Sequence, residues 1–455
     1  MADNFGLPKI SINFKSTAST AFIESKRGTV ALVLHDDALR DESIFFNVTE
    51  AGEIPIEITS ENAEYIKLAL GGAPQNILGY VIPPESYEIE SEVATTTTIQ
   101  SEMTITVPVT QEAGAGEGSA ESGGADLDDL GGDEYETQTV ISDVTVPTTT
   151  TVTVTVQSAI NLNSILAELG DMQFNWIACP DGNAQNQKDL AAWVKSQRKN
   201  KNKTFKAVVA NYSADDEGVV NFTTDDIKVE NPAYTDALTA AGGDESLVEV
   251  EKYITYNATQ FTARIAGLLA GLSFERSATY YGLADVVSVK RYEDIDEHIN
   301  TGEMCLFNEY DGNGVKIARA CNSLITFTAT HGESFRHVRT VEIIDFIADS
   351  IRNTFKKDYL GKVVNNYDNK KLLISAIGIF FNELTAESVL DSDGENYVEI
   401  DLEKNSDWAK LHSVDITGWT EEEIRRLNTG ENVFLSGKVT PLGAMESLTI
   451  NFALN

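Results

Sequence analysis

The sequence is short of basic residues. It has 34 Lys and Arg against 71 Asp and Glu, a formal net charge of −37, and no Lys or Arg at all from Leu68 to Gln187. Binding to nucleic-acid phosphates or docking on an anionic membrane surface requires the opposite charge. We therefore expect no direct nucleic-acid partner and no membrane insertion. A large acidic surface of this kind is typical of an abundant protein that stays soluble.

Cysteine and long apolar runs are also scarce. The three cysteines, Cys179, Cys305 and Cys321, show no CxxC spacing, which favours a reducing compartment and small buried thiols. The most apolar helical stretch, Ile265–Leu272, is too short to span a bilayer. The opening Met-Ala-Asp-Asn-Phe has neither a basic nor an apolar signal region. These features predict a soluble protein that is made in the cytoplasm.

Motifs of catalysis and metal binding are missing. The sequence has no Walker motif, no GxGxxG after a strand and no GxSxG elbow. His331, Glu333 and His337 could ligate a metal, but their spacing matches no HExxH pattern, and a polar loop explains them better. Asp311–Gly314 lacks the later acidic positions of an EF-hand and is better read as a hairpin turn. His35 has no nucleophile at a recognisable spacing. We expect no catalytic residue, no metal site and no cofactor.

The two ends of the sequence carry nearly the same phrase, Ile10–Phe14 and Leu448–Phe452. Both alternate apolar and polar residues at the period of a half-buried strand. A lone strand has unpaired N–H and C=O groups that seek a partner. We therefore predict strand arms that pair within the molecule or with its neighbours, which is typical of an assembly protein. The apolar positions of the arms are Ile10, Ile12, Phe14, Leu448, Ile450 and Phe452.

A Thr-rich, acidic region interrupts the chain. Thr95–Val109 and Thr137–Val156 alternate Thr with Val or Ile, which predicts strands. A glycosylated stalk is the alternative for the Thr runs. Glu112–Asp133, between them, is rich in Gly and acid and cannot bury enough apolar surface to fold alone. We interpret the region as an inserted β element whose tip points into solvent.

The rest of the chain has an α/β pattern. Strand Phe174–Cys179, amphipathic helix Gln187–Lys199 and strand Phe205–Ala210 predict a parallel pair with a crossover helix. The helix Tyr256–Leu272 carries small residues that allow close packing. Another helix, Glu61–Leu70, is expected to end at a left-handed glycine. Further strands are predicted at Gly28–Leu34, Phe45–Val48, Ile54–Ile58, Leu78–Ile82 and Asp285–Val289, and a hairpin is predicted from Met304–Phe307 and Val315–Ala320.

The final third begins with two long predicted helices, Val341–Tyr359 and Asn369–Leu390. Strands are predicted at Tyr397–Leu402 and Val433–Val439, and Thr420–Glu423 is a capping box. Arg352, Lys356 and Lys357 can share one face of the first helix, and Arg425 with Arg426 forms a second basic site. Two interpretations are open for these residues: an ordinary solvated face, or a grip on an acidic partner surface.

The predicted fold class is multidomain α/β, with a central mixed α/β domain, a C-terminal α/β domain, an inserted β-rich domain and extended terminal arms. The predicted segments are 1–20 (N-terminal arm), 21–86 (small α/β region), 87–157 (β-rich acidic insertion facing outward), 158–340 (central domain), 341–440 (C-terminal domain) and 441–455 (C-terminal arm).

Several short phrases also occur in a characteristic order, covering both ends and the region from about Ile254 onward. They are Pro8–Phe14, Arg27–Ala31, Ala263–Gly271, Arg276–Tyr280, Asn300–Glu303, Val315–Arg319, Asn322–Leu324, Ile344–Ile351, Tyr359–Val363 and Asn366–Lys370. Together they resemble contractile phage tail sheath proteins. The acidic insertion departs from any common pattern, and the resemblance implies only that such inserts vary and decorate the outside.

This resemblance implies a non-enzymatic subunit that forms stacked hexameric rings around an inner tube and contracts to drive the tube through a target envelope. The implied partners are other copies of the chain, the inner tail tube protein, and baseplate and tail terminator proteins. The C-terminal domain would face the tube, so the basic residues above would contact it. The terminal arms would complete a small sheet on adjacent subunits. The protein would be made in the bacterial cytoplasm as part of a phage tail or a released tail-like particle.

Two other classes compete with this interpretation. A surface-layer or adhesin-like protein that exchanges strands would share the arms and the Thr-rich strands, but would need an export signal. An α/β enzyme with an inserted lid would need a convergent polar site. Electron microscopy separates the three, because they predict a helical tube, a flat lattice or fibre, and single particles.

Overall fold

The computed structural model describes residues 27–108, 135–309, 312 and 314–450. These residues form two compact units. The larger contains the described parts of the chain up to Glu85 and from Ser158 onward, and the smaller is Ser86–Gln157. None of the helices among the described residues is long and apolar enough to cross a membrane.

The larger unit is built on a seven-stranded sheet with the order β13-β8-β7-β6-β1-β3-β2. Neighbouring strands are parallel except for the edge strand β2, which runs antiparallel to β3. Strands from the region 21–86 and from the region 158–340 therefore share one sheet. The strands are β1 (Thr29–His35), β2 (Ile44–Val48), β3 (Asn76–Ile82), β6 (Trp176–Ala178), β7 (Lys206–Ala210), β8 (Val219–Phe222) and β13 (Glu303–Met304).

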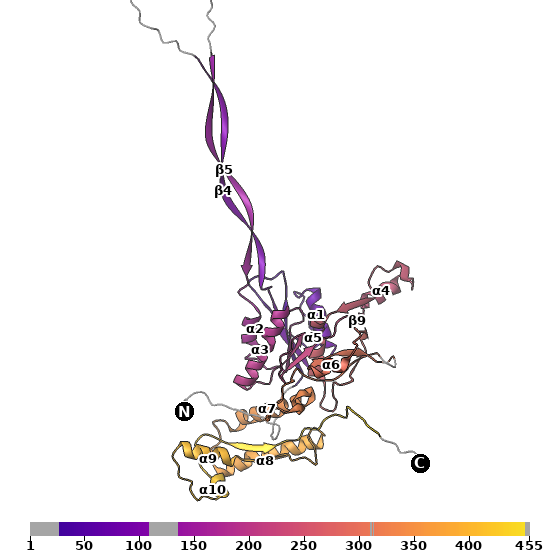
Figure 1. Ribbon diagram of the computed structural model, residues 1–455, viewed down its shortest axis with the longest axis vertical. Coiled ribbons are helices and arrows are strands. Elements are labelled where there is room, and N and C mark those ends of the chain that lie inside the picture. The colour runs from indigo at the N-terminus through magenta and orange to yellow at the C-terminus, as the bar shows by residue number, and fades with distance from the viewer. Residues whose placement is uncertain (1–26, 109–134, 310–311, 313, 451–455) are drawn as a thin grey trace, which may run out of the picture. The chain divides into compact units, whose positions relative to one another are not determined.

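Helices cover both faces of this sheet (Figure 1). Helices α1 (Ser60–Leu70) and α5 (Ala258–Gly271) pack on one face, where Leu32 of β1 is buried. Helices α2 (Leu162–Leu169) and α3 (Ala184–Lys201) pack on the other, where Val33 is buried. Side chains of a strand alternate between faces, so a sheet covered on both sides needs continuously apolar strands such as β1. The predicted β6–α3–β7 parallel unit is confirmed.

The small residues of α5 allow it to lie against α1. A Cβ atom on Gly267 would stand 2.0 Å from the carbonyl oxygen of Ala69, and one on Gly72 would stand 2.1 Å from the backbone nitrogen of Leu268. These contacts are with backbone atoms, which cannot rotate away as a flexible side chain can. The predicted close packing of this helix is confirmed.

The Gly267→Ala variant should therefore lower the free energy of unfolding by about 1–3 kcal/mol, because the added methyl group overpacks the α1–α5 contact. Gly378 of α8 (Tyr367–Ala386) is the matched control, since a Cβ there would meet nothing within 4 Å. In urea titrations Gly378→Ala should be neutral or stabilising by up to about 1 kcal/mol. Equal effects of the two substitutions would contradict the packing argument.

Two small sheets and helix α6 adjoin the main sheet, and helix α4, which has no buried residue, follows β9. One sheet has the order β10-β9-β12 and the other β11-β15-β14. The hairpin predicted near Asp311–Gly314 is confirmed, since β14 and β15 pair antiparallel. The elements are α4 (Pro232–Ala240), α6 (Ile295–Asn300), β9 (Ile227–Glu230), β10 (Tyr253–Tyr256), β11 (Gly282–Leu283), β12 (Val286–Ser288), β14 (Leu306–Asn308) and β15 (Val315–Ile317).

The last third has its own core. Helix α7 (Val338–Thr354) continues into a π-helical turn, Phe355–Tyr359. Ile343 and Ile347 of α7 pack with apolar residues of α8, including Phe381. The remaining elements are β16 (Tyr397–Ile400), α9 (Leu402–Leu411), α10 (Glu421–Arg425) and β17 (Leu435–Lys438), with β16 and β17 antiparallel.

Three local predictions were wrong. Ile54–Ile58 is not a strand: it follows a 3₁₀ turn at Ala51–Glu53, and Pro55, which has no N–H to donate, accepts a bond from Ile58. Gly71, which follows α1, has a right-handed backbone conformation, and the left-handed residue is Ala73. Gly71 and Gly72 are instead needed because they lie against α5. The strand at Tyr397 ends at Ile400, because the next residue caps α9.

The smaller unit is a long hairpin. Strands β4 (Ser86–Pro108) and β5 (Tyr135–Gln157) pair antiparallel along their full 23 residues and form a twisted ribbon (Figure 1). The two predicted Thr-rich strands are confirmed. The predicted loop Glu112–Asp133 lies outside the described residues.

Candidate functional site

The described part of the C-terminal arm is exposed. Leu448 and Ile450 have 83% and 57% of their surface accessible. The closing strand predicted at Leu448–Phe452 is not formed in its described part, because residues 442–450 form no strand in the single chain. The other predicted arm residues, Ile10, Ile12, Phe14 and Phe452, lie outside the described residues. The two described apolar positions of the arm are thus free to be covered by another surface.

A polar anchor fixes the segment just before these residues. Ser277 donates a hydrogen bond of 2.9 Å to Glu446, and Arg319 forms an ion pair with the same carboxylate at 3.3 Å. Ser277 belongs to the phrase Arg276–Tyr280, and Arg319 follows β15. The anchor therefore fixes where the arm leaves the folded unit and leaves Leu448 and Ile450 beyond it.

A buried ion cluster lies at the amino-terminal ends of the parallel strands. It consists of Arg27, Arg198, Lys206, Glu342 and Asp345. Lys206 opens β7 and lies 3.3 Å from Glu342 and 3.0 Å from Asp345, both on α7. Arg27 lies 2.7 Å from Glu342, and Arg198 of α3 lies 2.8 Å from Asp345. The cluster ties α7 to the sheet through residues up to 315 positions apart in the sequence.

Electrostatics inside the cluster favour the charged forms. Burial alone would raise the pKa of Glu342, but Lys206 and Arg27 outweigh it and hold that pKa below its ordinary value. Burial would likewise raise the pKa of Asp345, and Arg198 and Lys206 hold it down. Lys206 is only 1% exposed. Each acid therefore has two cationic partners, which is what a buried carboxylate needs to stay ionised.

Sequence reasoning missed this cluster. The available signal was a lysine at the start of an otherwise apolar strand, together with Glu342 and Asp345 spaced to share one face of an amphipathic helix. Because the five residues come from four separate segments, their spacing alone could not reveal that they meet.

The predicted basic residues have different environments. Arg352 is half-buried and forms an ion pair with Asp349, one turn earlier in α7. Lys356 and Lys357, in the π-helical turn, are exposed and have no ion pair with any described residue. Arg425 pairs with Glu399 at 2.9 Å, and Arg426 pairs with Glu422 at 2.9 Å. The two lysines are therefore the most available cations of the five.

A basic surface does form around Lys356. Burial lowers the pKa of Lys203; nearby Asp171 raises it, whereas Lys356 and Arg352 lower it further, and the net shift is downward. Lys203 follows α3 and lies far from Lys356 in the sequence. Thr204, the residue after Lys203, donates a 2.6 Å hydrogen bond to Asp349, which also pairs with Arg352, so Lys203 lies beside this part of α7. We call Lys203, Arg352, Lys356 and the adjacent Lys357 the basic patch.

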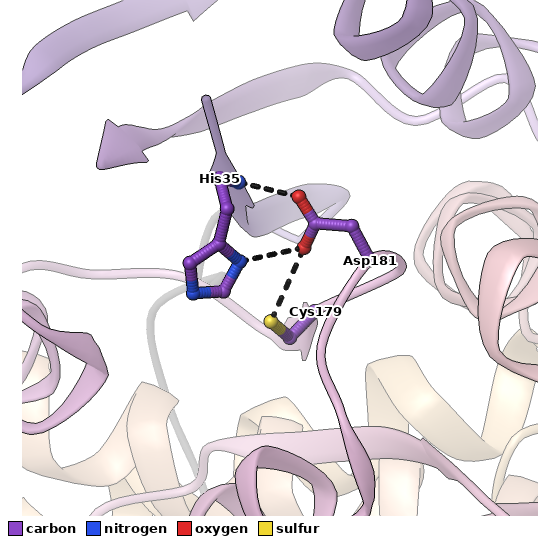
Figure 2. Close-up of side chains that lie close together, drawn as sticks. All are labelled: His35, Cys179 and Asp181. Carbon is purple, nitrogen blue, oxygen red and sulfur yellow. Dashed lines mark hydrogen bonds and ion pairs between the residues drawn. The ribbon is translucent and has the colours of Figure 1, made fainter. Parts of the chain in front are cut away.

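A second polar cluster lies at the opposite, carboxyl ends of the strands (Figure 2). His35 ends β1, and Cys179 and Asp181 follow β6. The ring nitrogen Nδ1 of His35 is 3.0 Å from Asp181 Oδ1, the backbone N–H of His35 donates to the same carboxylate, and the Cys179 thiol donates to it at 3.6 Å. The strands that follow β1 in the sequence are added on one side of it, and the strands from β6 onward are added on the other side, so the order of the sheet reverses between β1 and β6. In doubly wound sheets this is where a ligand crevice usually opens.

This chain fills that position with its own side chains. Gln187 of α3 donates to the carbonyl oxygens of Cys179 and Gly182 and accepts from the N–H of Ala210 at the end of β7. Asp181 lies just before the amino-terminus of α3, where the helix dipole favours an anion and opposes a cation. The arrangement cross-links β1, β6 and β7 at the switch point.

The chemistry of the cluster is that of a structural cross-link. Burial and the adjacent Asp181 raise the pKa of Cys179 well above its ordinary value, so the thiol resists becoming a nucleophilic thiolate. Burial would lower the pKa of His35, but the hydrogen bond to Asp181 and nearby carboxylates raise it overall. The three ligand-type atoms lie within 4.8 Å of one another. A metal ion there would have to displace the hydrogen bonds just described.

The remaining polar candidates are dispersed or partnered. His298, Glu303 and Cys305 lie close together, with His298 Nδ1 2.7 Å from Glu303. Of the predicted trio, His331 lies 4.0 Å from Glu217. The backbone of His337 pairs with that of Cys321 in a single antiparallel β-bridge. His331, Glu333 and His337 do not appear together in any metal-ligand cluster of the described residues.

Comparison with known families assigns most of the chain. Residues 136–323 match a family model described as phage tail sheath protein central domain, and residues 330–455 match one described as phage tail sheath C-terminal domain. Over 447 residues the chain is 28% identical to a tail sheath protein of Clostridium phage phiCD119, covering 98% of each chain.

Solved structures have the same fold. A sheath tail protein from Desulfitobacterium hafniense matches with a TM-score of 0.54 and 19% identity, over 87% of this chain and 94% of that one. The helical sheath of the anti-feeding prophage in its contracted state matches with a TM-score of 0.55 and 10% identity, over 99% of this chain and 100% of that one.

Proposed function

The chain belongs to the phage tail sheath protein family, and we propose that it is the subunit of a contractile sheath that surrounds an inner tube. In this proposal, hexameric rings of the chain stack into a helical tube. When triggered, the tube shortens and drives the inner tube through the envelope of a target cell. The family is structural, and the polar cluster at the switch point has the chemistry of a cross-link, so no catalytic step is part of the proposal.

The observation that carries the proposal is the exposed arm. Leu448 and Ile450 alternate with polar residues, are largely accessible, and follow an anchor at Glu446 that fixes their starting point. A segment of this kind can become a strand by adding to the sheet edge of a neighbouring subunit, where each backbone hydrogen bond contributes about 0.5–1.5 kcal/mol. We propose that both arms form these joints. Ile10, Ile12 and Phe14 are the corresponding apolar positions of the N-terminal arm.

The buried ion cluster supports the second part of the proposal. A sheath that contracts by rotating its subunits needs units that move as rigid bodies between flexible joints. The cluster ties α7 to the central sheet through Lys206 and Arg198, so the C-terminal region would follow the sheet as one body. The joints would then lie in the arms.

The direct test is negative-stain electron microscopy of the purified chain. The proposal expects helical tubes. A flat lattice would favour a surface-layer or adhesin-like assembly, and single particles at high concentration would contradict assembly altogether. We also propose the inner tail tube protein and the baseplate and tail terminator proteins as partners, and the segment 87–157 as an outward-facing insertion. The place of synthesis would be the bacterial cytoplasm.

The basic patch is our candidate for the contact with the inner tube. Its exposed members Lys356 and Lys357 can form ion pairs with an acidic tube surface, and such pairs are weak singly and screened by salt, which suits a grip that must release. The Arg425–Arg426 site is the second candidate, although both of its guanidinium groups already have acidic partners within the chain.

Reversing Arg352, Lys356 and Lys357 to Glu should give sheaths that assemble without an inner tube. Because Arg352 is engaged by Asp349, the double variant Lys356→Glu/Lys357→Glu should suffice. Co-expression with the tube protein followed by microscopy counts filled and empty sheaths. Arg425→Glu/Arg426→Glu tests the second candidate site in the same assay. Filled, extended particles from both the double and the triple variant would exclude the basic patch as the grip.

A further inference from the structure

The two faces of the β4–β5 ribbon differ in chemistry. Residue pairing along the ribbon places odd-numbered residues of β4 on the same face as even-numbered residues of β5, for example Ile89 opposite Val154. The other face has Glu88, Glu90 and Glu92 opposite Thr155, Thr153 and Thr151, and a single described large apolar side chain, Ile141, opposite Glu102. We call these the apolar face and the acidic face. The described large side chains of the apolar face are Ile89, Val93, Met103, Val146, Val152 and Val154, and between 37% and 58% of the surface of each is exposed.

An isolated ribbon of this kind has no core. A two-stranded hairpin is marginally stable in water, and a sheet with one apolar face needs something to cover it. Large exposed apolar patches on soluble proteins usually mark interaction sites. The described large apolar side chains of this face run from Ile89 to Met103 along β4, which is longer than an ordinary strand.

We propose that the apolar face packs against the apolar face of the same hairpin in a second copy of the chain. The result is a four-stranded sandwich between subunits, with the acidic faces outward. The pairing concerns the hairpin and goes beyond the arm joints of the proposed sheath. It draws on the proposed function only in that an assembly raises the effective concentration of neighbouring hairpins.

The area of the face is sufficient for a stable contact. Strands of 23 residues rise about 3.3 Å per residue, so the ribbon is about 75 Å long and, with two strands, about 10 Å wide. Two such faces would bury about 1,500 Å² in total, which lies within the range of about 1,200–2,000 Å² for specific protein interfaces.

The negative charge of the hairpin favours packing through the apolar faces over joining the ribbons by their edges. The segment from Leu68 to Gln187 contains no Lys or Arg, so nothing on the hairpin can neutralise Glu88, Glu90 or Glu92 of a neighbour. Joining two ribbons by their edges would align their acidic faces side by side, and like charges on neighbouring strands are destabilising. Packing through the apolar faces places the two acidic faces on opposite outer surfaces. A basic partner protein would prefer the acidic face and would leave the apolar face uncovered.

Face-specific crosslinking tests the proposal. Val93→Cys places a thiol on the apolar face, and Ala94→Cys places one on the acidic face at the next residue; both positions are exposed. The native cysteines are buried, so they react slowly. A bis-maleimide that spans about 10 Å, the separation of packed sheets, is added to the full-length protein in tubes and in solution. Val93→Cys should give several-fold more crosslinked dimer than Ala94→Cys.

A second set of variants separates apolar contact from mere proximity. In the Val93→Cys background, the changes Ile89→Thr, Val152→Thr and Val154→Thr keep the β-branched shape but make the face polar. They should reduce the crosslink several-fold. Thr149→Ser, Thr151→Ser and Thr153→Ser change the acidic face and should leave it unchanged.

The outcomes are separable from those of the proposed function, because microscopy reports on tubes and crosslinking reports on hairpins. Tubes with equal crosslinking at the two positions, or with none at Val93→Cys, would overturn the hairpin proposal alone. If the chain forms no tubes, dimer from Val93→Cys in concentrated solution still supports the hairpin contact, and its absence there overturns it.

Discussion

Removal of Met445–Asn455 should give a folded, soluble chain that no longer forms tubes. The deleted segment contains Leu448 and Ile450, which are largely exposed, and its described residues, 445–450, belong to none of the buried apolar clusters. Its known contacts with the folded unit are those of Glu446 with Ser277 and Arg319. The Glu446 side chain is 14% exposed and that of Arg319 is 41% exposed, so losing this partly buried ion pair and the Ser277 hydrogen bond should lower the free energy of unfolding by about 1–2 kcal/mol, too little to unfold the chain. In the proposed sheath, loss of the arm would remove all the backbone hydrogen bonds of one joint between subunits.

Two smaller changes show which part of the segment matters. Deleting only 448–455 keeps the Glu446 anchor and removes the apolar positions, and it should abolish tubes as fully as the larger deletion. Glu446→Gln weakens the anchor but keeps the arm, so tubes should form at a higher protein concentration. Sedimentation velocity, circular dichroism and negative-stain microscopy of each protein give assembly state, folding and shape.

The arm interpretation fails in either of two cases. A truncated chain that polymerises like the full-length chain would show that the segment is not a joint. A truncated chain that cannot fold would show that residues 445–455 belong to the subunit itself. Because Met445 and Leu448 are so exposed in the single chain, we expect neither result.

Local periodicity predicted much of this fold from the sequence. The βαβ unit around α3 and the small-residue helix α5 have strong signals, since apolar spacing distinguishes helix from strand over such lengths. The alternation of Thr with Val likewise identified β4 and β5. These elements depend mainly on nearby residues, and the structure confirms them.

Short and polar elements were harder to predict. Helix α9 contains Glu403, Lys404, Asn405 and Asp407, so its apolar stripe is weak, and the sequence prediction extended the preceding strand into it. Gly71 resembles an ordinary C-terminal glycine of a helix. Its surroundings, however, are formed by α5, which lies nearly two hundred residues later in the sequence. In both cases a tertiary contact or a cap overrides the local pattern.

The polar clusters were beyond sequence reasoning for a similar reason. His35 meets Asp181 across 146 positions, and Arg27 meets Glu342 across 315. No spacing rule connects such distant residues, and only the order of strands in the sheet brings them together. The predicted basic residues show a different limit: Arg352 lies where helical spacing puts it, and its pairing with Asp349 one turn away becomes apparent only in the structure.

Lys206→Met should destabilise the subunit by about 3–5 kcal/mol, the loss expected when one member of a buried ionic group is removed. Methionine has a similar length, so packing is largely kept while the charge is lost. Glu342 and Asp345 then keep one cationic partner each, Arg27 and Arg198. The arm-deleted chain is suited to the measurement, because urea unfolding is then not coupled to assembly.

An exposed ion pair is the matched control. Lys410 and Asp407 lie 2.9 Å apart on α9, and their side chains are 69% and 62% exposed. Lys410→Met should therefore change the free energy of unfolding by no more than about 1 kcal/mol. Similar losses for the two Lys→Met variants would show that the buried cluster contributes little to stability.

Acid unfolding gives an independent check. The pKa values of Glu342 and Asp345 are held below their ordinary values, so the stabilisation they contribute is present above the unfolded-state pKa of about 4 and is lost as the pH falls through the lower folded-state values. Burial raises the pKa of Asp349, which acts in the opposite direction. Lys206→Met should lose stability at neutral pH and then show a shallower decline in acid than the parent chain.

A double variant separates lost charge from lost packing. Counting the nearby Glu217, 3.7 Å from Arg198, the parent group has three cations and three carboxylates, and Lys206→Met leaves one carboxylate in excess. In Lys206→Met/Glu342→Gln the charges balance again, with Arg27 and Arg198 against Asp345 and Glu217. If the loss in Lys206→Met arises from uncompensated negative charge, the second change should recover part of it, giving a coupling free energy of about 1 kcal/mol or more. Additive losses would instead assign the effect to packing around β7, and the rigid connection between α7 and the sheet would then rest on apolar contacts.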